Sequence, residues 1–164
     1  MKIGCAKQDI TPRVGVELQG YGPYLCRHAD GVRDPLYARA MAFDVDGERA
    51  VLVSCDLVGV CAPTTEEARR LVGEATGLPP DRILIHGIHT HSGPALRVYG
   101  GWGTPDPPYL ELLPRHIARA CTQAMDNLQE ATLAHAEVPC QGIAINRVYD
   151  KFRAETVEEV LDDD

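Results

Sequence analysis

Two apolar runs near the middle of the chain predict a β-hairpin. Residues 37–45 and 49–58 are both rich in Ala, Val, Leu and Phe. The dipeptide Asp46-Gly47 lies between them and is a strong signal for a tight turn with positive φ angles. The two runs are therefore expected to pair as neighbouring antiparallel strands.

A surface helix of about 13 residues is predicted after the hairpin. Apolar residues recur at helical spacing at Ala68, Leu71, Val72 and Ala75. Residues 63–67 supply a capping residue, an early proline and acidic side chains that suit the positive end of a helix dipole. Gly77 and the prolines that follow it predict the end of this helix.

The second half of the chain predicts a strand, a loop and a longer helix. Residues 82–89 are short and β-branched, which predicts a buried strand that runs into a loop. After the Gly- and Pro-rich stretch 93–108, an amphipathic helix is expected up to about residue 128, with Pro114 marking either a kink or its first turn. Further short strands are expected at 131–138 and 142–146.

Strands and helices alternate along the chain, which predicts a single α/β domain with a mixed β-sheet and flanking helices. One strand–helix–strand passage is expected between residues 51 and 88. A length of 164 residues with 45% hydrophobic content suits one domain, 1–164, ending in an acidic tail that is helical or frayed.

Charge and composition narrow the expected partners. Sixteen Lys plus Arg against 24 Asp plus Glu give a net charge of −8, so nucleic acid is not an expected partner. No run of about 18 apolar residues predicts a transmembrane segment, and no signal peptide is visible, which favours a cytoplasmic location. The six cysteines form no C-x-x-C pair and are expected to be reduced. Nothing in the pattern specifies an oligomeric state.

The candidate chemistry lies where the predicted strand 82–89 ends. His89 and His91 stand two residues apart, and on an extended segment they would project from the same face. Neutral imidazole is a common zinc ligand, and a catalytic zinc typically takes three protein ligands and keeps an open position for water. The two histidines can therefore supply only some of the ligands of a catalytic zinc site. His86 points to the opposite face and is expected to be a hydrogen-bonded core histidine.

Three other residues could complete a metal site by their type. They are His28, Asp34 and Asp56. For the two aspartates, hydrogen bonding to turn amides is the more usual role. Gly20, Gly22 and Gly93 are interpreted as turn residues.

Around the histidine pair the sequence resembles the neutral/alkaline non-lysosomal ceramidase family. The resemblance rests on His89-Thr90-His91-Ser92-Gly93-Pro94 together with five other segments in the family's order. These are Asp9-Ile10-Thr11-Pro12, Gly20-Tyr21-Gly22, residues 34–40, residues 51–57 and Asn146-Arg147. The match spans nearly the whole chain.

The resemblance implies an amidase that uses one Zn²⁺ ion to cleave the N-acyl bond of ceramide-like lipids. It implies that His89 is a zinc ligand, that His91 is a catalytic group beside the metal, and that Arg147 contacts the substrate or the released carboxylate. The family's other zinc ligands lie downstream of the segments matched here, so the chain is expected to be the N-terminal part of such a catalytic domain. Residues 95–97 depart from the glycine that continues the family motif, which alters the loop facing the substrate. Members of the family are commonly secreted or membrane-associated.

Two alternatives stay open. His-x-His at a strand end also occurs in barrel-shaped metal-dependent amidohydrolases, although there it lies on the first strand. A catalytically silent binding or scaffold domain could also keep this fold without a complete set of ligands. Metal content and turnover separate this silent domain from the two enzyme hypotheses.

Overall fold

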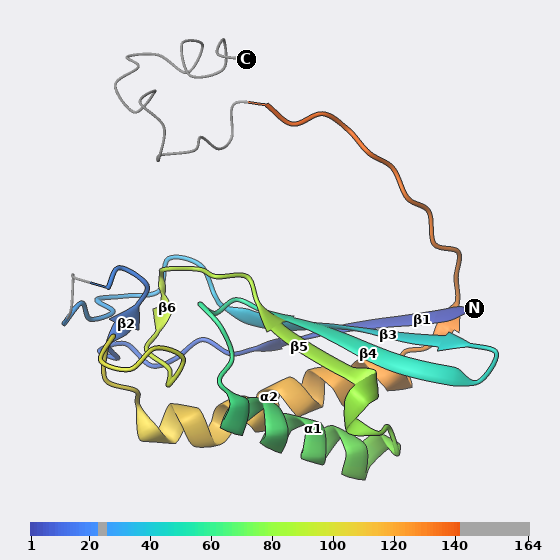
Figure 1. The fold of residues 1–164 in the computed structure, drawn as a ribbon, viewed down its shortest axis with the longest axis horizontal. Helices are drawn as coiled ribbons and strands as arrows, with labels where there is room; N and C mark the ends of the chain where they lie inside the picture. The colour runs from blue at the N-terminus through green and yellow to red at the C-terminus, as the bar shows by residue number, and fades with distance from the viewer. Residues whose placement is uncertain (23–25, 142–164) are drawn as a thin grey trace. The chain divides into compact units, whose positions relative to one another are not determined.

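The computed structural model describes residues 1–22 and 26–141 (Figure 1). Residues 1–132 form one compact unit that contains every helix and strand of the described part. Residues 133–141 contain no helix or strand, and their side chains are exposed.

The main sheet has five strands in the order β5-β4-β3-β1-β7. Their bounds are β1 Lys2–Asp9, β3 Tyr37–Val45, β4 Glu48–Cys55, β5 Ile83–Gly87 and β7 Gln129–Glu130. β4 and β5 run parallel, whereas the other neighbouring pairs are antiparallel. This is the mixed sheet that the sequence predicts.

Two helices cover one face of the sheet (Figure 1). They are α1 (Ala62–Thr76) and α2 (Pro107–Asp126), and a 3-10 turn (Pro80–Arg82) leads into β5. A separate two-stranded ribbon pairs β2 (Leu18–Gln19) with β6 (Gly93–Pro94). Of the helices in the described residues, none combines the length and the hydrophobicity that crossing a membrane would require.

The predicted hairpin and its turn are confirmed. β3 and β4 pair from Val45 opposite Glu48 to Ala38 opposite Cys55. Asp46 and Gly47 both take positive φ, at 55° and 90°, as a two-residue turn between right-twisted strands requires.

Both predicted helices form, but their first turns differ from the prediction. α1 begins at Ala62 and has Cys61 as its N-cap, so Thr64 lies inside the helix and the first turn holds no acidic residue. Gly77 ends α1 in a left-handed conformation, with its N–H donating to the Gly73 carbonyl. α2 begins at Pro107, which places Pro114 inside the helix and rules it out as the first turn.

Two strand predictions were wrong in detail. β5 is an edge strand with only Ile83 fully buried, because a strand paired on one side alone leaves its outer side to water. The strand expected at 131–138 is absent from the described residues, where β7 is limited to Gln129–Glu130. The predicted strand 142–146 and the acidic tail lie outside the described residues.

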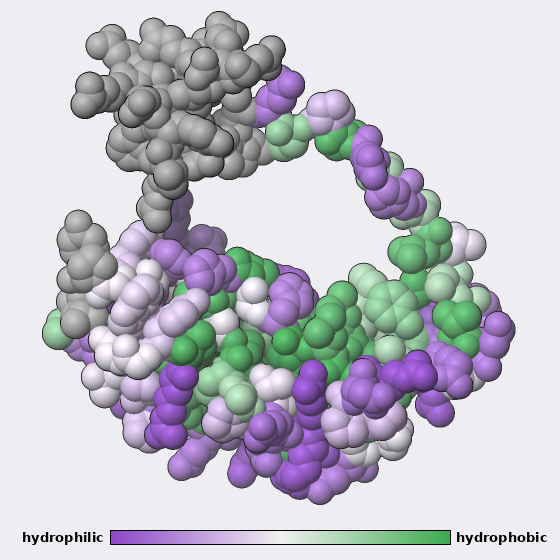
Figure 2. Space-filling view, viewed as in Figure 1, coloured by the Kyte–Doolittle hydropathy of each residue, from purple (hydrophilic) through white to green (hydrophobic). Residues whose placement is uncertain are grey.

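The core fills the space between the sheet and the two helices. Val53 and Cys55 from β4 meet Val72 from α1 and Ile117 and Cys121 from α2, and all five are fully buried. The opposite face of the sheet remains exposed in the described part of the chain. Cys5, Met41, Leu52 and Leu84 form one row across four strands there, and Figure 2 shows hydrophobic side chains gathered over the strands.

Packing of α2 can be tested with two adjacent leucines. Leu113 is 1% exposed and Leu112 is 48% exposed. Leu113→Ala should lower the free energy of unfolding by about 2–5 kcal/mol, because it leaves a cavity in the core. Leu112→Ala should change it by less than about 0.5 kcal/mol. Urea denaturation followed by circular dichroism measures both, and equal effects would contradict this placement of the helix.

All six cysteines are free in the structure, and their reactivity should depend on burial. Burial raises the pKa of Cys55 and Cys121 to about 12. At pH 8 only about one in 10,000 of these thiols would be the reactive thiolate. Iodoacetamide should therefore label the exposed Cys5, Cys26 and Cys140 in the folded protein but reach Cys55 and Cys121 only after unfolding. Peptide mass mapping distinguishes the five sites, and labelling of Cys55 at native pH 8 would refute the assignment.

Candidate functional site

The histidine pair follows the end of β5, beside the end of β4. Because these strands are parallel, the segments that leave them run side by side. The N–H of Ile88 donates to the carbonyl of Cys55 at 3.1 Å, and the N–H of His89 donates to that of Leu57 at 2.9 Å. Gly87 makes this approach possible, since a Cβ there would lie 2.8 Å from the Cα of Gly59.

His89 is held by a hydrogen bond from its own ring. Its Nδ1 lies 2.8 Å from the backbone carbonyl of Val58. A carbonyl can only accept, so Nδ1 carries the proton and the neutral ring presents a lone pair at Nε2. Metal-bound histidines are oriented in the same way, by a second-shell acceptor on the other ring nitrogen.

The backbone of His89 differs from the prediction. His89 has a φ of 69°, in the left-handed region, so the pair does not stand on an extended strand. The two rings nevertheless lie together, with centroids 4.9 Å apart and ring planes at 69°. The predicted neighbourhood of His89 and His91 is therefore found, but a bend in the chain produces it instead of strand alternation.

His91 is supported by three residues from the segment around β2. The ring of Tyr21 meets the His91 ring edge-on at 4.9 Å, and Arg27 lies over the face of Tyr21 at 4.8 Å. Arg27 also donates to the backbone carbonyl of His91 at 3.1 Å. Gly20 has a φ of 135°, and a Cβ there would lie 2.5 Å from the His91 side chain. Gly20 is therefore required by close contact as well as by its turn conformation.

The contact of Arg27 with His91 was not predicted from the sequence. The two residues are 64 positions apart, and no short motif connects them. The only sequence signal nearby was the Gly20-Tyr21-Gly22 segment, whose glycines indicate a close backbone approach without naming the partner.

His28 and Asp34 lie on a different side of the motif. They line a hollow of about 590 Å³ together with Thr90 and Ser92, the residues that alternate with the two histidines. The Nδ1 of His28 is already 2.9 Å from the carbonyl of Cys26. Neither His89 nor His91 lines this hollow, so His28 and Asp34 do not join the histidine pair.

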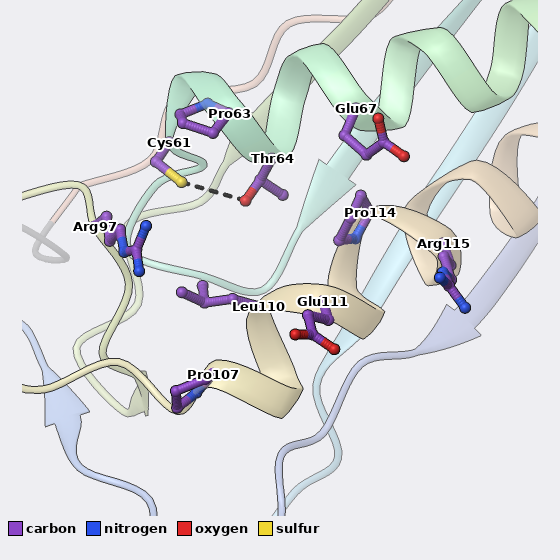
Figure 3. Close-up of a pocket in the computed structure, with 10 residues that line it drawn as sticks. All are labelled: Cys61, Pro63, Thr64, Glu67, Arg97, Pro107, Leu110, Glu111, Pro114 and Arg115. Carbon is purple, nitrogen blue, oxygen red and sulfur yellow. Dashed lines mark hydrogen bonds between the residues drawn. The ribbon is translucent and has the colours of Figure 1, made fainter.

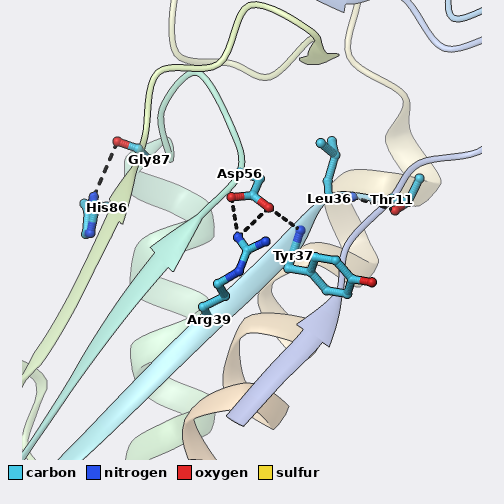
Figure 4. A network of polar contacts seen from close by, with 7 residues as sticks. All are labelled: Thr11, Leu36, Tyr37, Arg39, Asp56, His86 and Gly87. Atoms are coloured by element: carbon cyan, nitrogen blue, oxygen red, sulfur yellow. Dashed lines mark hydrogen bonds and ion pairs between the residues drawn. The ribbon is translucent and has the colours of Figure 1, made fainter. Parts of the chain in front are cut away.

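Asp56 has a structural role (Figure 4). The Asp56 side chain is 11% exposed, and its carboxylate accepts from Arg39 on both oxygens at 2.5 and 2.6 Å and from the N–H of Tyr37 at 2.9 Å. A carboxylate engaged in this way ties the end of β4 to the start of β3. His86 is exposed, and its Nδ1 lies 3.4 Å from the carbonyl of Gly87 (Figure 4), so the expectation of a core histidine was wrong.

The Asp9-Ile10-Thr11-Pro12 segment is also structural. The carboxylate of Asp9 accepts from the N–H of Thr11 at 2.7 Å, and hydrogen bonding from the Thr11 side chain together with this N–H lowers the pKa of Asp9. The hydroxyl of Thr11 then accepts from the N–H of Leu36 at 2.9 Å (Figure 4). These bonds fasten the exit of β1 to the entry of β3.

A complete metal site is not present within residues 1–22 and 26–141. No group of three His, Cys, Asp or Glu side chains there is arranged to hold a metal ion. The lone pair at Nε2 of His89 fits the chemistry of a zinc ligand. Arg147 lies outside the described residues, so its predicted contact with the substrate stays a prediction.

A second cavity, of about 450 Å³, lies between the first turns of α1 and α2 (Figure 3). Arg97, Glu111 and Arg115 line it, and the Sγ of Cys61 lies 3.2 Å from the hydroxyl of Thr64 at its upper edge. The histidine motif does not line this cavity, and none of its charged side chains is buried. It is separate from the candidate site.

Comparison with known proteins agrees with the resemblance seen in the sequence. The family described as neutral/alkaline non-lysosomal ceramidase, N-terminal, matches residues 1–161. The crystal structure of neutral ceramidase from Pseudomonas aeruginosa is similar with a TM-score of 0.67 and 25% identity, over 78% of this chain and 22% of that one. A ceramidase complexed with C2 is similar with a TM-score of 0.69 and 25% identity, over 78% of this chain and 21% of that one.

This chain thus spans about one fifth of the length of these two ceramidases. The family match extends from the first residue almost to the last. The chain belongs to the neutral/alkaline non-lysosomal ceramidase family.

Proposed function

We propose that this chain supplies part of the active site of a zinc-dependent amide hydrolase that cleaves the N-acyl bond of ceramide-like lipids. The observation that carries the proposal is the hydrogen bond from Nδ1 of His89 to the Val58 carbonyl. It fixes the tautomer that leaves Nε2 free to bind a metal. Family membership and the names of the two similar ceramidases support the choice of a lipid amide as substrate.

His89 would hold the zinc ion through Nε2, with the remaining ligands coming from residues other than those described. Zinc bound there would polarise the amide carbonyl and supply an activated water molecule at neutral pH. The bend at His89 and the carbonyl of Val58 would keep the ring in one orientation, which limits the reorganisation needed on binding.

His91 would serve as the proton-carrying group of the reaction. Its ring lies 4.9 Å from that of His89, close enough for one substrate amide to reach both. A proton held on a ring nitrogen of His91 would be donated as charge develops on the amide. Gly20 and Tyr21 pack against this ring, and Arg27 holds its backbone, so its position would be set before the substrate binds. Arg147 would bind the carboxylate product through its fixed positive charge.

Zinc binding tests the role of His89. Because the described residues hold no complete metal site, the quantity to compare is zinc affinity: His89→Ala should lower it by at least about tenfold, since a direct ligand matters at least as much as an outer-shell partner. His86→Ala is the matched control, because His86 is an exposed histidine of the same segment and should leave zinc binding unchanged. Isothermal titration calorimetry with zinc chloride measures all three proteins. Equal zinc affinity in wild type and His89→Ala would exclude His89 as a ligand.

Hydrolysis of a fluorescent N-acyl-sphingosine tests the role of His91. His91→Ala should keep its zinc but lose about 100- to 1,000-fold in kcat, the usual loss when one group that stabilises the transition state is removed. Wild-type protein that binds zinc without any hydrolysis would instead indicate a catalytically silent domain. Hydrolysis of other amides but not of N-acyl-sphingosine would indicate a different metal-dependent hydrolase.

A further inference from the structure

Two exposed aromatic side chains meet in the loop between β6 and α2. Tyr99 is 39% exposed and Trp102 is 40% exposed, and their ring centroids are 4.9 Å apart with the planes tilted by 37°. The chain contains only one Trp, six Tyr and two Phe. Two of these nine aromatic residues therefore lie in one loop with their rings exposed. We call Tyr99 and Trp102 the aromatic pair.

The loop that carries the aromatic pair is fixed by a single carboxylate. Glu17 accepts from the N–H of Thr104 at 2.8 Å and from the N–H of Cys26 at 3.1 Å, and its backbone carbonyl accepts from the N–H of Ala95 at 2.7 Å. The hydrogen bond from Thr104 is the main reason why the pKa of Glu17 is lowered. Gly103 has a φ of 97° and packs against Ala95, where a Cβ would come within 2.8 Å. The aromatic pair thus stands on a loop tied down at its end.

Two contacts connect the aromatic pair to the histidine site. A Cβ on Gly22 would lie 2.8 Å from the six-membered ring of Trp102, so the backbone of Gly22 rests on that ring. Gly20, two residues earlier, packs in the same way on His91, and the chain between them spans at most about 7 Å. Val98, in the same loop, packs against Gly59, and Gly59 directly follows Val58, whose carbonyl holds the His89 ring.

We propose that the aromatic pair binds the apolar chain of the lipid amide that reaches His89 and His91, and so helps to determine substrate specificity. This inference rests on the proposed function, from which it takes the substrate to be a ceramide-like lipid amide. Aromatic rings offer large rigid apolar surfaces that lose little conformational entropy on binding. The net charge of −8 disfavours the anionic surface of a bilayer as the occupant.

The single tryptophan makes the inference directly measurable. Trp102 emission should change saturably when the full chain is titrated with N-hexanoyl-sphingosine below its critical micelle concentration. N-acetylethanolamine has an amide but no long chain, and it should leave the emission unchanged. Tyr99→Ala should weaken the apparent affinity at least about tenfold, and Tyr99→Phe should restore it, because an apolar ring and not a hydroxyl makes the contact.

Three controls keep the outcomes separate. Leu84→Ala removes a 58% exposed leucine from β5 and should bind the probe like wild type. Circular dichroism checks that each variant is folded. Phosphatidylcholine vesicles without any sphingolipid should give no change in Trp102 emission. An equal change with these vesicles would mean that the aromatic pair binds a membrane surface and not the hydrocarbon chain of a substrate, which would overturn the proposal.

The proposal and the proposed function can fail independently. His89→Ala should still show a saturable change in Trp102 emission with N-hexanoyl-sphingosine, with a weaker affinity because the amide loses its contact with the metal, whereas the hydrocarbon chain keeps its contact with the aromatic pair. If the wild-type protein holds no zinc but still binds the hydrocarbon chain of the probe, the role of the aromatic pair is supported and the zinc hydrolase is contradicted. Zinc-dependent hydrolysis with unchanged Trp102 emission, or with full affinity in Tyr99→Ala, would refute the role of the aromatic pair alone.

Discussion

The close approach of two backbone segments after β4 and β5 is the constraint on which the candidate site depends. Parallel pairing brings the ends of these strands together, and Gly87 lets the following segments touch where any side chain would clash with Gly59. Hydrogen bonds from Ile88 and His89 then continue the contact beyond the strands. The carbonyl of Val58 reaches the His89 ring because the backbone has already been set beside it. The chemistry of the ring therefore follows from sheet geometry.

Several polar groups near the site stabilise the scaffold and are already paired. Both carboxylate oxygens of Asp56 accept from Arg39, and one of them also accepts from the backbone N–H of Tyr37. These bonds leave the carboxylate little capacity to bind a metal. Asp9 is engaged by Thr11 in the same manner. Buried or partly buried carboxylates that lose such partners leave unpaired charge behind, so they tend to stay paired. His89 differs because its Nδ1 donates to the Val58 carbonyl while its Nε2 has no hydrogen-bond partner among residues 1–22 and 26–141, which is the state expected of a ligand.

The sequence predicted those parts of the structure that depend on local interactions. The hairpin turn at Asp46-Gly47 and the left-handed end of α1 at Gly77 follow from the conformational freedom of single residues, and both are confirmed. The edge position of β5 could not be predicted, because strand order depends on contacts between distant residues. The pairing of His89 with His91 was expected on a strand, yet a positive φ at His89 produces it. Periodicity alone carries no information about a left-handed non-glycine residue.

The segment around β2 joins features of the site that are far apart in the sequence. Within a few residues, it packs on His91 through Gly20, on Trp102 through Gly22, and across to the loop before α2 through Glu17. Glycine at the first two of these contacts lets the backbone rest directly on a ring, which leaves few rotamers to be lost on binding. A displacement of this segment would therefore move the His91 ring and the aromatic pair together. For a substrate with a polar amide and an apolar chain, such coupling keeps the reacting group and the chain contact at a fixed separation, so that chain binding also places the amide.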